Sequence, residues 1–433
     1  MTAALVLQPL TAVAAPFPPL GACSGPDCPA SYPPPNNGDF AGRDATINVF
    51  AGGNYTVEGR AAEAEGKIVT LGNLTVAKVG GGAFNMGVVG VGSRVPPPSG
   101  TDHVTVGGNV LVYAGNRVLI GGSDSRTTVW GNLRYGGTTT GTVELVPPGA
   151  QIHDPTVGTA FAPVRTTIAR LSACTATAAA TGTVTVTNSE ATFTGDGTST
   201  RQIFDVNQSL TSASGGQIGL VFRNIPAGAT VVVNMLPENA VINTYSGTGQ
   251  PGDPLTGLRP KLLWNFPAAS SARITGGAQF QGSVLAGNPN GTTRVDVAGL
   301  NGRVYLAGNL VQAGTGGYEI HAYDFTGDLP GCGIPTPTPT PMPTPTPPIP
   351  TPTLTPTPTA RPSWPGSHTP WPTGGGSGSG GSGWGGHPSG GGDGQHLANA
   401  GDGLADPGLT AAGLLLVAGG VTLLVGRRRG RHG

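Results

Sequence analysis

One short phrase, a few β-branched or aliphatic residues followed by glycine and asparagine, recurs through residues 39–331. In the first half of this region its asparagines are Asn54, Asn73, Asn109 and Asn132, at steps of 19, 36 and 23 residues. The middle step is close to twice the first, and the phrase returns at Asn309. A period of about twenty residues, with short strands and a turn in each repeat, is typical of the coils of a β-solenoid.

These repeats predict an all-β fold, a right-handed parallel β-helix (solenoid), for residues 39–331. We expect glycine and asparagine to take the positive φ of the coil corners, while the flanking Val, Ile and Leu point inward. The alternative is an antiparallel β-sandwich, because short strands with frequent turns also describe that class. The region has no long stretch of helical periodicity, and residues 147–215 fit neither fold, so we expect them to form an inserted or capping element.

The segment after the repeats is rich first in proline and then in glycine and serine. From Pro335 to about Arg361, proline stands at nearly every second position, mostly alternating with threonine. Proline fixes φ and donates no backbone hydrogen bond, so polyproline II is the regular form left to it. About 28 such residues would extend roughly 90 Å. With the Gly/Ser run that starts at Gly374, residues 332–396 are predicted to be a disordered stalk.

The two ends of the chain indicate export. Residues 1–15 form an apolar run that ends in small residues, which predicts a signal peptide followed by a linker at 16–38. The run lacks the Lys/Arg segment that normally precedes it, so we expect its start to be truncated. Residues 408–426 carry no charge, and as a helix they would span roughly 28 Å, enough for one transmembrane helix.

The apolar span is preceded by the pentapeptide Leu397, Ala398, Asn399, Ala400 and Gly401 and followed by an arginine-rich tail. In this layout residues 397–433 resemble a Gram-positive cell-wall sorting signal. Basic residues stay on the cytoplasmic side, which places the body of the protein on the extracellular face. The resemblance implies sortase and cell-wall peptidoglycan as partners, with the membrane contacted through the C-terminal helix. Ala400 departs from the pattern, which has threonine there.

The charge balance of the chain limits the partners that it can bind. Lys plus Arg (22) equals Asp plus Glu (22) and charged residues are 10% of the chain, so no broad basic face exists and nucleic acid is not an expected partner.

The four cysteines of an exported chain can form disulfides. Cys23 and Cys28 are close enough to close a small loop, which leaves Cys174 with Cys332. No Cys/His cluster has metal-ligand spacing, so we expect neither a metal nor a cofactor.

Several motifs follow one another within residues 39–328, among them Phe40-Ala41-Gly42, Leu263-Trp264-Asn265-Phe266-Pro267, Leu300-Asn301-Gly302-Arg303-Val304 and Tyr318-Glu319-Ile320-His321-Ala322-Tyr323. In kind and in order these motifs resemble the choice-of-anchor A family. Members of that family are bacterial surface proteins that join an adhesive domain to varied C-terminal anchors. The resemblance implies a surface adhesin with an unknown extracellular glycan or protein ligand. The segment 264–310 is also similar to the β-helix of ice-binding proteins, which supports the solenoid.

Parallel β-helices also host polysaccharide-degrading enzymes, which need clustered carboxylates and a basic residue on one face. The candidates are Glu58 with Arg60, Arg294 with Asp296, and the group Glu319, His321 and Asp324. Each of the two pairs would share one face of a strand, and a solvated ion pair explains them without catalysis, with His321 at the surface or in a cap. We therefore expect no enzyme. The predicted function is a surface-anchored adhesive domain on a stalk, and the alternative is a structural coat component without a ligand.

Overall fold

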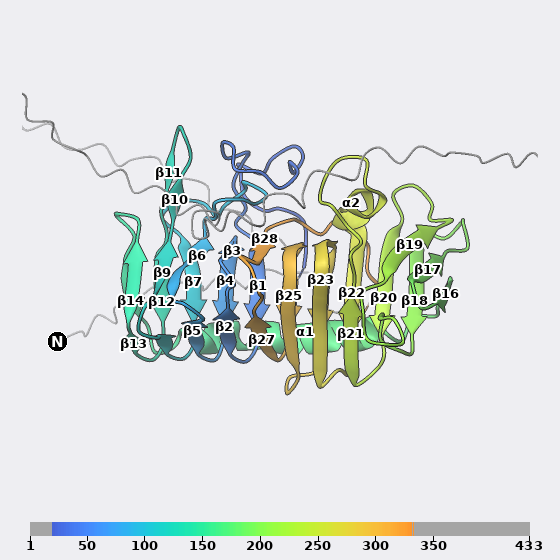
Figure 1. Cartoon of the computed structure of the whole chain (residues 1–433). Coiled ribbons are helices and arrows are strands. Elements are labelled where there is room, and N and C mark those ends of the chain that lie inside the picture. The colour runs from blue at the N-terminus through green and yellow to red at the C-terminus, as the bar shows by residue number, and fades with distance from the viewer. Residues whose placement is uncertain (1–19, 331, 333–433) are drawn as a thin grey trace, which may run out of the picture. The chain divides into compact units, whose positions relative to one another are not determined.

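A computed structural model of the chain describes residues 20–330 and Cys332 (Figure 1). The predicted signal peptide, the stalk beyond Cys332 and the sorting signal with its span at 408–426 lie outside the described residues. Neither α-helix in the described part of the chain combines the length and apolar character that a membrane crossing requires.

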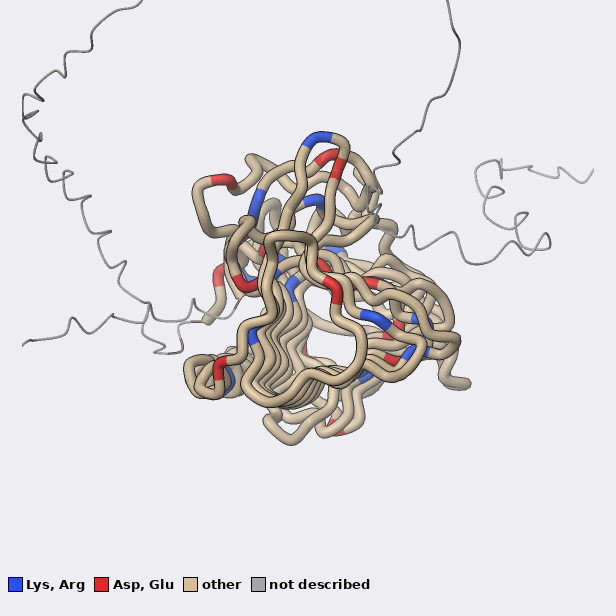
Figure 2. Tube along the Cα trace, turned by 90° about the vertical axis from the view of Figure 1, so that its left-hand side faces the viewer, with Lys and Arg blue, Asp and Glu red and all other residues tan. Residues whose placement is uncertain are grey.

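The described residues form a β-solenoid with three faces. The first face is a ten-stranded sheet with the order β15 (Gln151–His153), β12 (Asn132–Tyr135), β7 (Asp102–Val106), β4 (Lys67–Thr70), β1 (Ile47–Ala51), β26 (Val304–Leu306), β24 (Ser283–Ala286), β22 (Leu262–Phe266), β20 (Thr230–Met235) and β18 (Arg201–Val206). Viewed along the axis, the coils lie behind one another (Figure 2).

A second sheet of thirteen strands covers the other two faces. The second face has the order β13 (Thr139–Thr140), β8 (Val110–Val112), β5 (Leu74–Lys78), β2 (Tyr55–Gly59), β27 (Asn309–Gln312), β25 (Thr292–Asn301), β23 (Ser271–Gln281) and β21 (Asn239–Asn243). The third face has β14 (Thr142–Leu145), β9 (Asn116–Ile120), β6 (Gly82–Gly87), β3 (Glu63–Glu65) and β28 (Glu319–His321). The long strand β25 joins the two faces, because its first half pairs with β27 and its last residues pair with β28.

Every strand pair within these two sheets is parallel, which confirms the parallel solenoid and excludes the antiparallel sandwich. The antiparallel strand pairs in the described residues are the hairpin β10 (Gly122–Ser123) with β11 (Thr128–Val129), and β16 (Thr183–Val186) with β17 (Glu190–Thr194); Asn36 and Gly92 form one isolated antiparallel bridge. A three-stranded sheet of β16, β17 and β19 (Gly219–Arg223) lies at one end of the solenoid (Figure 1).

The coils are not stacked in chain order. The first coil, β1 to β3, pairs with the last coil, β26 to β28, in the middle of the stack. From this boundary, here called the seam, β4 to β15 run towards one end, and the chain then returns from the other end through β18 to β28. The seam therefore brings together residues about 250 positions apart, such as Tyr55 and Leu310.

The helix α1 (Val157–Thr175) connects the two ends and lies along the first face (Figure 1). Its buried residues Val164, Ile168 and Leu171 pack against outward side chains of that face, among them Phe50 and Leu285. The prediction of no helical periodicity was wrong here. Apolar or small residues stand at 157, 161, 164, 168, 171 and 175, alternating steps of four and three that match a helical face, and Pro163 obscured the pattern. Two shorter elements, α2 (Pro254–Leu258) and the 3₁₀ helix η1 (Arg259–Lys261), precede β22.

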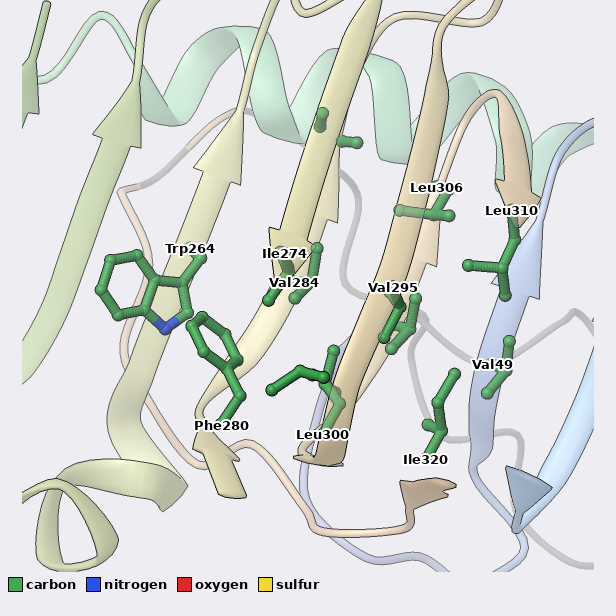
Figure 3. Close-up of a cluster of buried hydrophobic side chains, with 14 of the residues drawn as sticks. Val49, Trp264, Ile274, Phe280, Val284, Val295, Leu300, Leu306, Leu310 and Ile320 are labelled. Carbon is green, nitrogen blue, oxygen red and sulfur yellow. The ribbon is translucent and has the colours of Figure 1, made fainter. Parts of the chain in front are cut away.

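Inward side chains stack along the axis to form the core (Figure 3). Val49, Val284, Val295 and Leu300 are fully buried, as is Trp264, whose Nε1 donates to the Gln281 carbonyl at 2.9 Å. Each buried aliphatic side chain of this size contributes about 1.5–3 kcal/mol relative to exposure, so the stacked interior holds the coils in register.

Asparagine side chains link the coils at the corner between the first and second faces. The backbone N–H of Asn54 donates to Oδ1 of Asn309, that of Asn73 to Oδ1 of Asn54, and that of Asn109 to Oδ1 of Asn73, at 2.8–2.9 Å. The predicted coil of 19 residues, from Asn54 to Asn73, is thus confirmed. The step of 36 residues is also one coil, lengthened by an excursion between β6 and β7. Asn132 is wrongly placed in the series, since it begins β12 and accepts from the Ala150 N–H instead.

The glycine before each ladder asparagine is required by close packing. The predicted positive φ was wrong for these glycines, although glycines at other corners, such as Gly59 and Gly66, do have it. Gly53, Gly72 and Gly108 are absent from the residues with positive φ. A Cβ on each would lie 2.3–2.5 Å from the Oδ1 atom of an asparagine in the neighbouring coil. The recurring Gly-Asn motif therefore indicates a close contact between coils rather than a left-handed turn.

We expect Gly72→Ala to lower the free energy of unfolding by about 1–3 kcal/mol. The added methyl would lie 2.3 Å from Asn54 Oδ1 and 2.8 Å from the Gly53 backbone, so the ladder must shift. Chemical denaturation measures the loss. Gly257→Ala is the control, because a Cβ there meets no atom within 4 Å outside its own short helix. Equal stability of the two variants would contradict the packing role of the ladder glycines.

Two disulfides join the cysteines in the pairing expected from the sequence. Cys23 bonds to Cys28, and Cys174 bonds to Cys332 across a separation of 158 residues. Cys174 lies in the last turn of α1 and Cys332 follows the last strand. The second bond therefore ties the helix on the first face to the point where the chain leaves the solenoid.

Candidate functional site

A groove runs along the corner between the second and third faces and is here called the axial groove. Its volume is about 970 Å³. The lining comes from β21, β23, β25, β2 and β5, the loops after them and after β27, and the loop before β19: Glu58, Gly59, Ala77, Val79, Gly216, Gln217, Asn243, Arg273, Thr275, Gly276, Gly277, Arg294, Asp296, Gly314, Thr315 and Tyr318. The groove therefore crosses successive coils and passes over the seam.

Glycines allow the backbone to bend and the coils to pack closely at the axial groove. A Cβ on Gly276 would lie 2.1 Å from the Thr244 carbonyl oxygen, and one on Gly59 would lie 2.5 Å from that of Gly314. Both glycines also have positive φ, at 116° and 59°, which side-chain-bearing residues rarely adopt. At Gly276 the register of β23 against β25 is interrupted. The axial groove therefore lies over bent backbone in which neighbouring coils are in close contact.

Four charged side chains form one network across the floor of the axial groove. Arg294 Nη1 donates to Glu58 Oε1 at 2.5 Å, and Arg294 Nε lies 3.4 Å from Asp296 Oδ2. Arg273 Nη2 donates to the same Asp296 oxygen at 2.6 Å. Partial burial alone would lower the pKa of Arg294, but its hydrogen bond to Glu58 and the charges of both carboxylates raise it. Two cations and two anions thus neutralise one another.

Of the two charged pairs predicted from the sequence, one is present in the network and the other is replaced by a different pair. Arg294 and Asp296 do share a face, but Glu58 pairs with Arg294 across the seam rather than with Arg60, which makes no ion pair among the described residues. The sequence analysis did not identify Arg273 as a site residue. Its position 21 residues before Arg294, one coil length, could have indicated that the two lie side by side, and they are register partners on β23 and β25.

Tyrosines lie in and beside the axial groove. Tyr318 lines it where β28 begins. Tyr245, two residues after the lining residue Asn243, is 59% exposed, and Tyr113, on the coil next to that of Val79, is also 59% exposed. Aromatic side chains left this exposed are available for contact with a ligand.

The group Glu319 and His321 belongs to a different, buried cluster at the seam. His321 Nε2 lies 2.8 Å from Glu319 Oε2, and its Nδ1 lies 2.8 Å from Asn301 Oδ1. His321 is fully buried, so the predicted surface position was wrong. Asp324 lies apart, with Arg303 and Asp44 as charged neighbours; burial raises its pKa. The described residues contain no set of His, Cys, Asp and Glu side chains arranged to hold a metal ion.

Glu63 completes this seam cluster from the neighbouring strand. It is the register partner of Glu319 across β3 and β28, and it accepts hydrogen bonds from Asn85 Nδ2 at 2.6 Å and Gly90 N at 2.9 Å. Burial and the adjacent Glu319 raise the pKa of Glu63 to about 7. Burial alone would lower the pKa of His321, but the hydrogen bond and charge of Glu319, with the charges of Glu65 and Glu63, raise it.

We expect the wild-type protein to lose about 2–3 kcal/mol of its free energy of unfolding between pH 5 and pH 8.5, relative to the Glu63→Gln variant. The folded-state pKa of about 7 lies above the usual glutamate value of 4.5, so the stabilising proton is present below pH 4.5 and is lost as the pH rises through 7. His103, whose pKa burial lowers to about 4, acts in the opposite direction and cancels in the difference between the two proteins. Denaturation at both pH values measures this; parallel pH profiles for the two proteins would contradict it.

Residues 42–322 match the family described as "Putative Ice-binding-like adhesive domain". The match runs from before β1 to the end of β28 and so includes both halves of the solenoid, the seam and the axial groove. No curated protein and no solved structure matches the chain. The matched residues make up more than half of the 433-residue chain. The protein therefore belongs to this ice-binding-like adhesive domain family.

Proposed function

We propose that the protein is a cell-surface adhesin that binds its ligand in the axial groove and does not transform it. The observation that carries this proposal is the groove itself, an open and elongated site within the residues that match the adhesive family. Both carboxylates in it, Glu58 and Asp296, are engaged by arginines. A general acid or base needs a carboxyl group free to exchange a proton with substrate, so this arrangement favours binding over catalysis.

The rest of the chain supports display away from the cell. The Pro/Thr and Gly/Ser composition of residues 332–396 suits a spacer. The layout of residues 397–433, and the resemblance to the choice-of-anchor A family, favour attachment to peptidoglycan by a sortase, with residues 408–426 in the membrane before cleavage. In this proposal the solenoid stands outside the cell on an extended stalk.

Attachment of cells that carry the full chain tests the proposal. Gly277 lies in the axial groove, lacks a positive φ, and a Cβ there would have Gln217 Oε1 at 3.5 Å as its nearest contact. The site therefore tolerates a Cβ, and we expect the ring of Gly277→Phe to obstruct the groove and abolish attachment to glycan- or matrix-coated surfaces. Gly257→Phe, at an open glycine outside the groove, is the control. Unchanged attachment would favour a structural coat protein, and release of reducing ends would favour an enzyme.

The sorting signal gives a separate prediction. Ala400 lacks the methyl and hydroxyl groups of threonine, and loss of such a contact in an enzyme pocket typically costs about 1–3 kcal/mol of discrimination. We expect slow processing, with a mixed population that is mostly wall-linked and partly held in the membrane through residues 408–426. Ala400→Thr should shift the population towards the wall. Fractionation with a muralytic enzyme measures both pools; a wholly membrane-bound protein that Ala400→Thr leaves unchanged would contradict the sortase assignment.

A further inference from the structure

We infer that the axial groove takes one uncharged polysaccharide chain, extended along the solenoid axis. This inference rests on the proposed function and names its ligand class. Four observations carry it: the direction of the groove, the pairing of the strands beneath it, the balance of its charges and the positions of its tyrosines.

The groove is long and runs parallel to the axis. Its lining follows the order of neighbouring strands β21, β23, β25, β27, β2 and β5 on the second face. Five steps between adjacent strands, at about 4.8 Å each, give a length of roughly 24 Å. A linear polymer of several units fits this shape, whereas a single small molecule would leave most of the groove empty.

The strands beneath the groove cannot capture a peptide by adding it to a sheet. Such capture needs a free strand edge with unpaired backbone groups. Here each of β23, β25, β27, β2 and β5 is hydrogen bonded to a strand on both sides, and a chain along the axis would cross them at a large angle. The ligand must therefore be held by side chains, which suits a polymer whose polar groups project from its units.

The charges favour a ligand without net charge. The charged lining residues are Glu58, Asp296, Arg273 and Arg294, two anions and two cations joined in one network. The side chains of Glu58, Arg294 and Arg273 remain 41%, 38% and 49% exposed. Their planar groups are already oriented by pairing and still offer donors and acceptors, which lowers the ordering cost of binding hydroxyl groups.

Tyr318 in the groove lining and the exposed Tyr245 and Tyr113 beside it are spaced evenly along the solenoid axis. From Tyr245 after β21, three steps through β23 and β25 reach the coil of Tyr318, and three more through β2 and β5 reach Tyr113 after β8. At about 4.8 Å per step, successive tyrosines are roughly 14 Å apart along the axis. Aromatic rings offer apolar faces on which the C–H faces of sugar rings can stack, while the network between them binds hydroxyls.

The test uses cells carrying the full chain and fluorescent hexasaccharides of glucose, mannose, xylose and galactose, with hexagalacturonate as the charged probe. We expect at least one neutral hexasaccharide to bind saturably, with its disaccharide at least tenfold weaker. Raising the salt from 50 to 500 mM should change Kd less than twofold, because no net charge is involved. Tyr245→Ala and Tyr113→Ala should each weaken binding about 3- to 10-fold. Leu236→Ala, an exposed apolar residue outside the groove lining, should not.

The outcomes separate this inference from the proposed function. If Gly277→Phe abolishes attachment but hexagalacturonate alone binds, or no hexasaccharide binds, the ligand class is wrong and the adhesin proposal stands. Tyrosine variants that behave like Leu236→Ala would also overturn the inference. If Gly277→Phe leaves attachment unchanged, the groove is not the adhesive site and both proposals fail.

Discussion

Replacing Cys174 and Cys332 together by alanine is expected to lower the free energy of unfolding by about 5 kcal/mol. The bond closes a loop of 158 residues, and a cross-link over so long a loop removes much of the entropy of the unfolded chain. Equilibrium denaturation of the oxidised protein and the variant, followed by two independent probes, measures the difference.

The second disulfide provides a matched control for this prediction. Cys23 and Cys28 are separated by five residues, so the same loop-entropy relation gives a loss of only about 2 kcal/mol when both are replaced by alanine. Equal losses for the two pairs, or a loss below 2 kcal/mol for the long-range pair, would show that the bond between Cys174 and Cys332 does not act by restricting the unfolded chain.

Asp44→Ala is expected to lower the free energy of unfolding by about 3–5 kcal/mol. Asp44 Oδ2 accepts from Arg303 Nη2 at 2.6 Å, and the two side chains are 2% and 0% exposed. Asp44 Oδ1 also accepts from the N–H groups of Ser24 and Thr46, so it holds the segment before β1 against the last coil. Removing it leaves a buried guanidinium without its anion, which is more costly than losing a surface pair.

Two further variants identify the cause of the Asp44→Ala loss. The surface pair of Glu58 and Arg294 is about 40% exposed, so Glu58→Ala should lower stability by about 1 kcal/mol or less. The double variant Asp44→Leu with Arg303→Met should be more stable than Asp44→Ala, because it removes the unpaired charge. Equal losses for Asp44→Ala and Glu58→Ala would contradict the buried role of this pair.

The class of fold could be predicted because the same contact between coils recurs along the solenoid and requires the same two residues, glycine and asparagine, each time. Each ladder asparagine accepts a hydrogen bond from the next coil, and each preceding glycine makes room for it. The pattern therefore predicts stacked coils even though positive φ was the wrong reason for the glycines. Asn132 carries the same letters at a different place in the coil, at the start of β12, where its Oδ1 accepts from the Ala150 N–H, so the phrase alone does not fix the position of every coil.

The candidate site could be predicted only in part, because the seam joins distant segments. Glu58 and Arg294 are 236 residues apart, and they meet because the first coil stacks on the last. No local period contains that information. The sequence instead paired Glu58 with Arg60, its near neighbour. The order of coils depends on α1, which carries the chain from one end of the stack to the other, and its helical pattern was obscured by Pro163.

The most direct test of the central claim, that adhesion occurs through the axial groove, is a competition experiment. Cells carrying the full chain attach to a ligand-coated surface in the presence of excess soluble protein comprising residues 16–396. We predict that the wild-type soluble protein inhibits attachment and that its Gly257→Phe variant inhibits equally, whereas the Gly277→Phe variant, folded as judged by circular dichroism, does not. Equal inhibition by the Gly277→Phe variant would contradict the account.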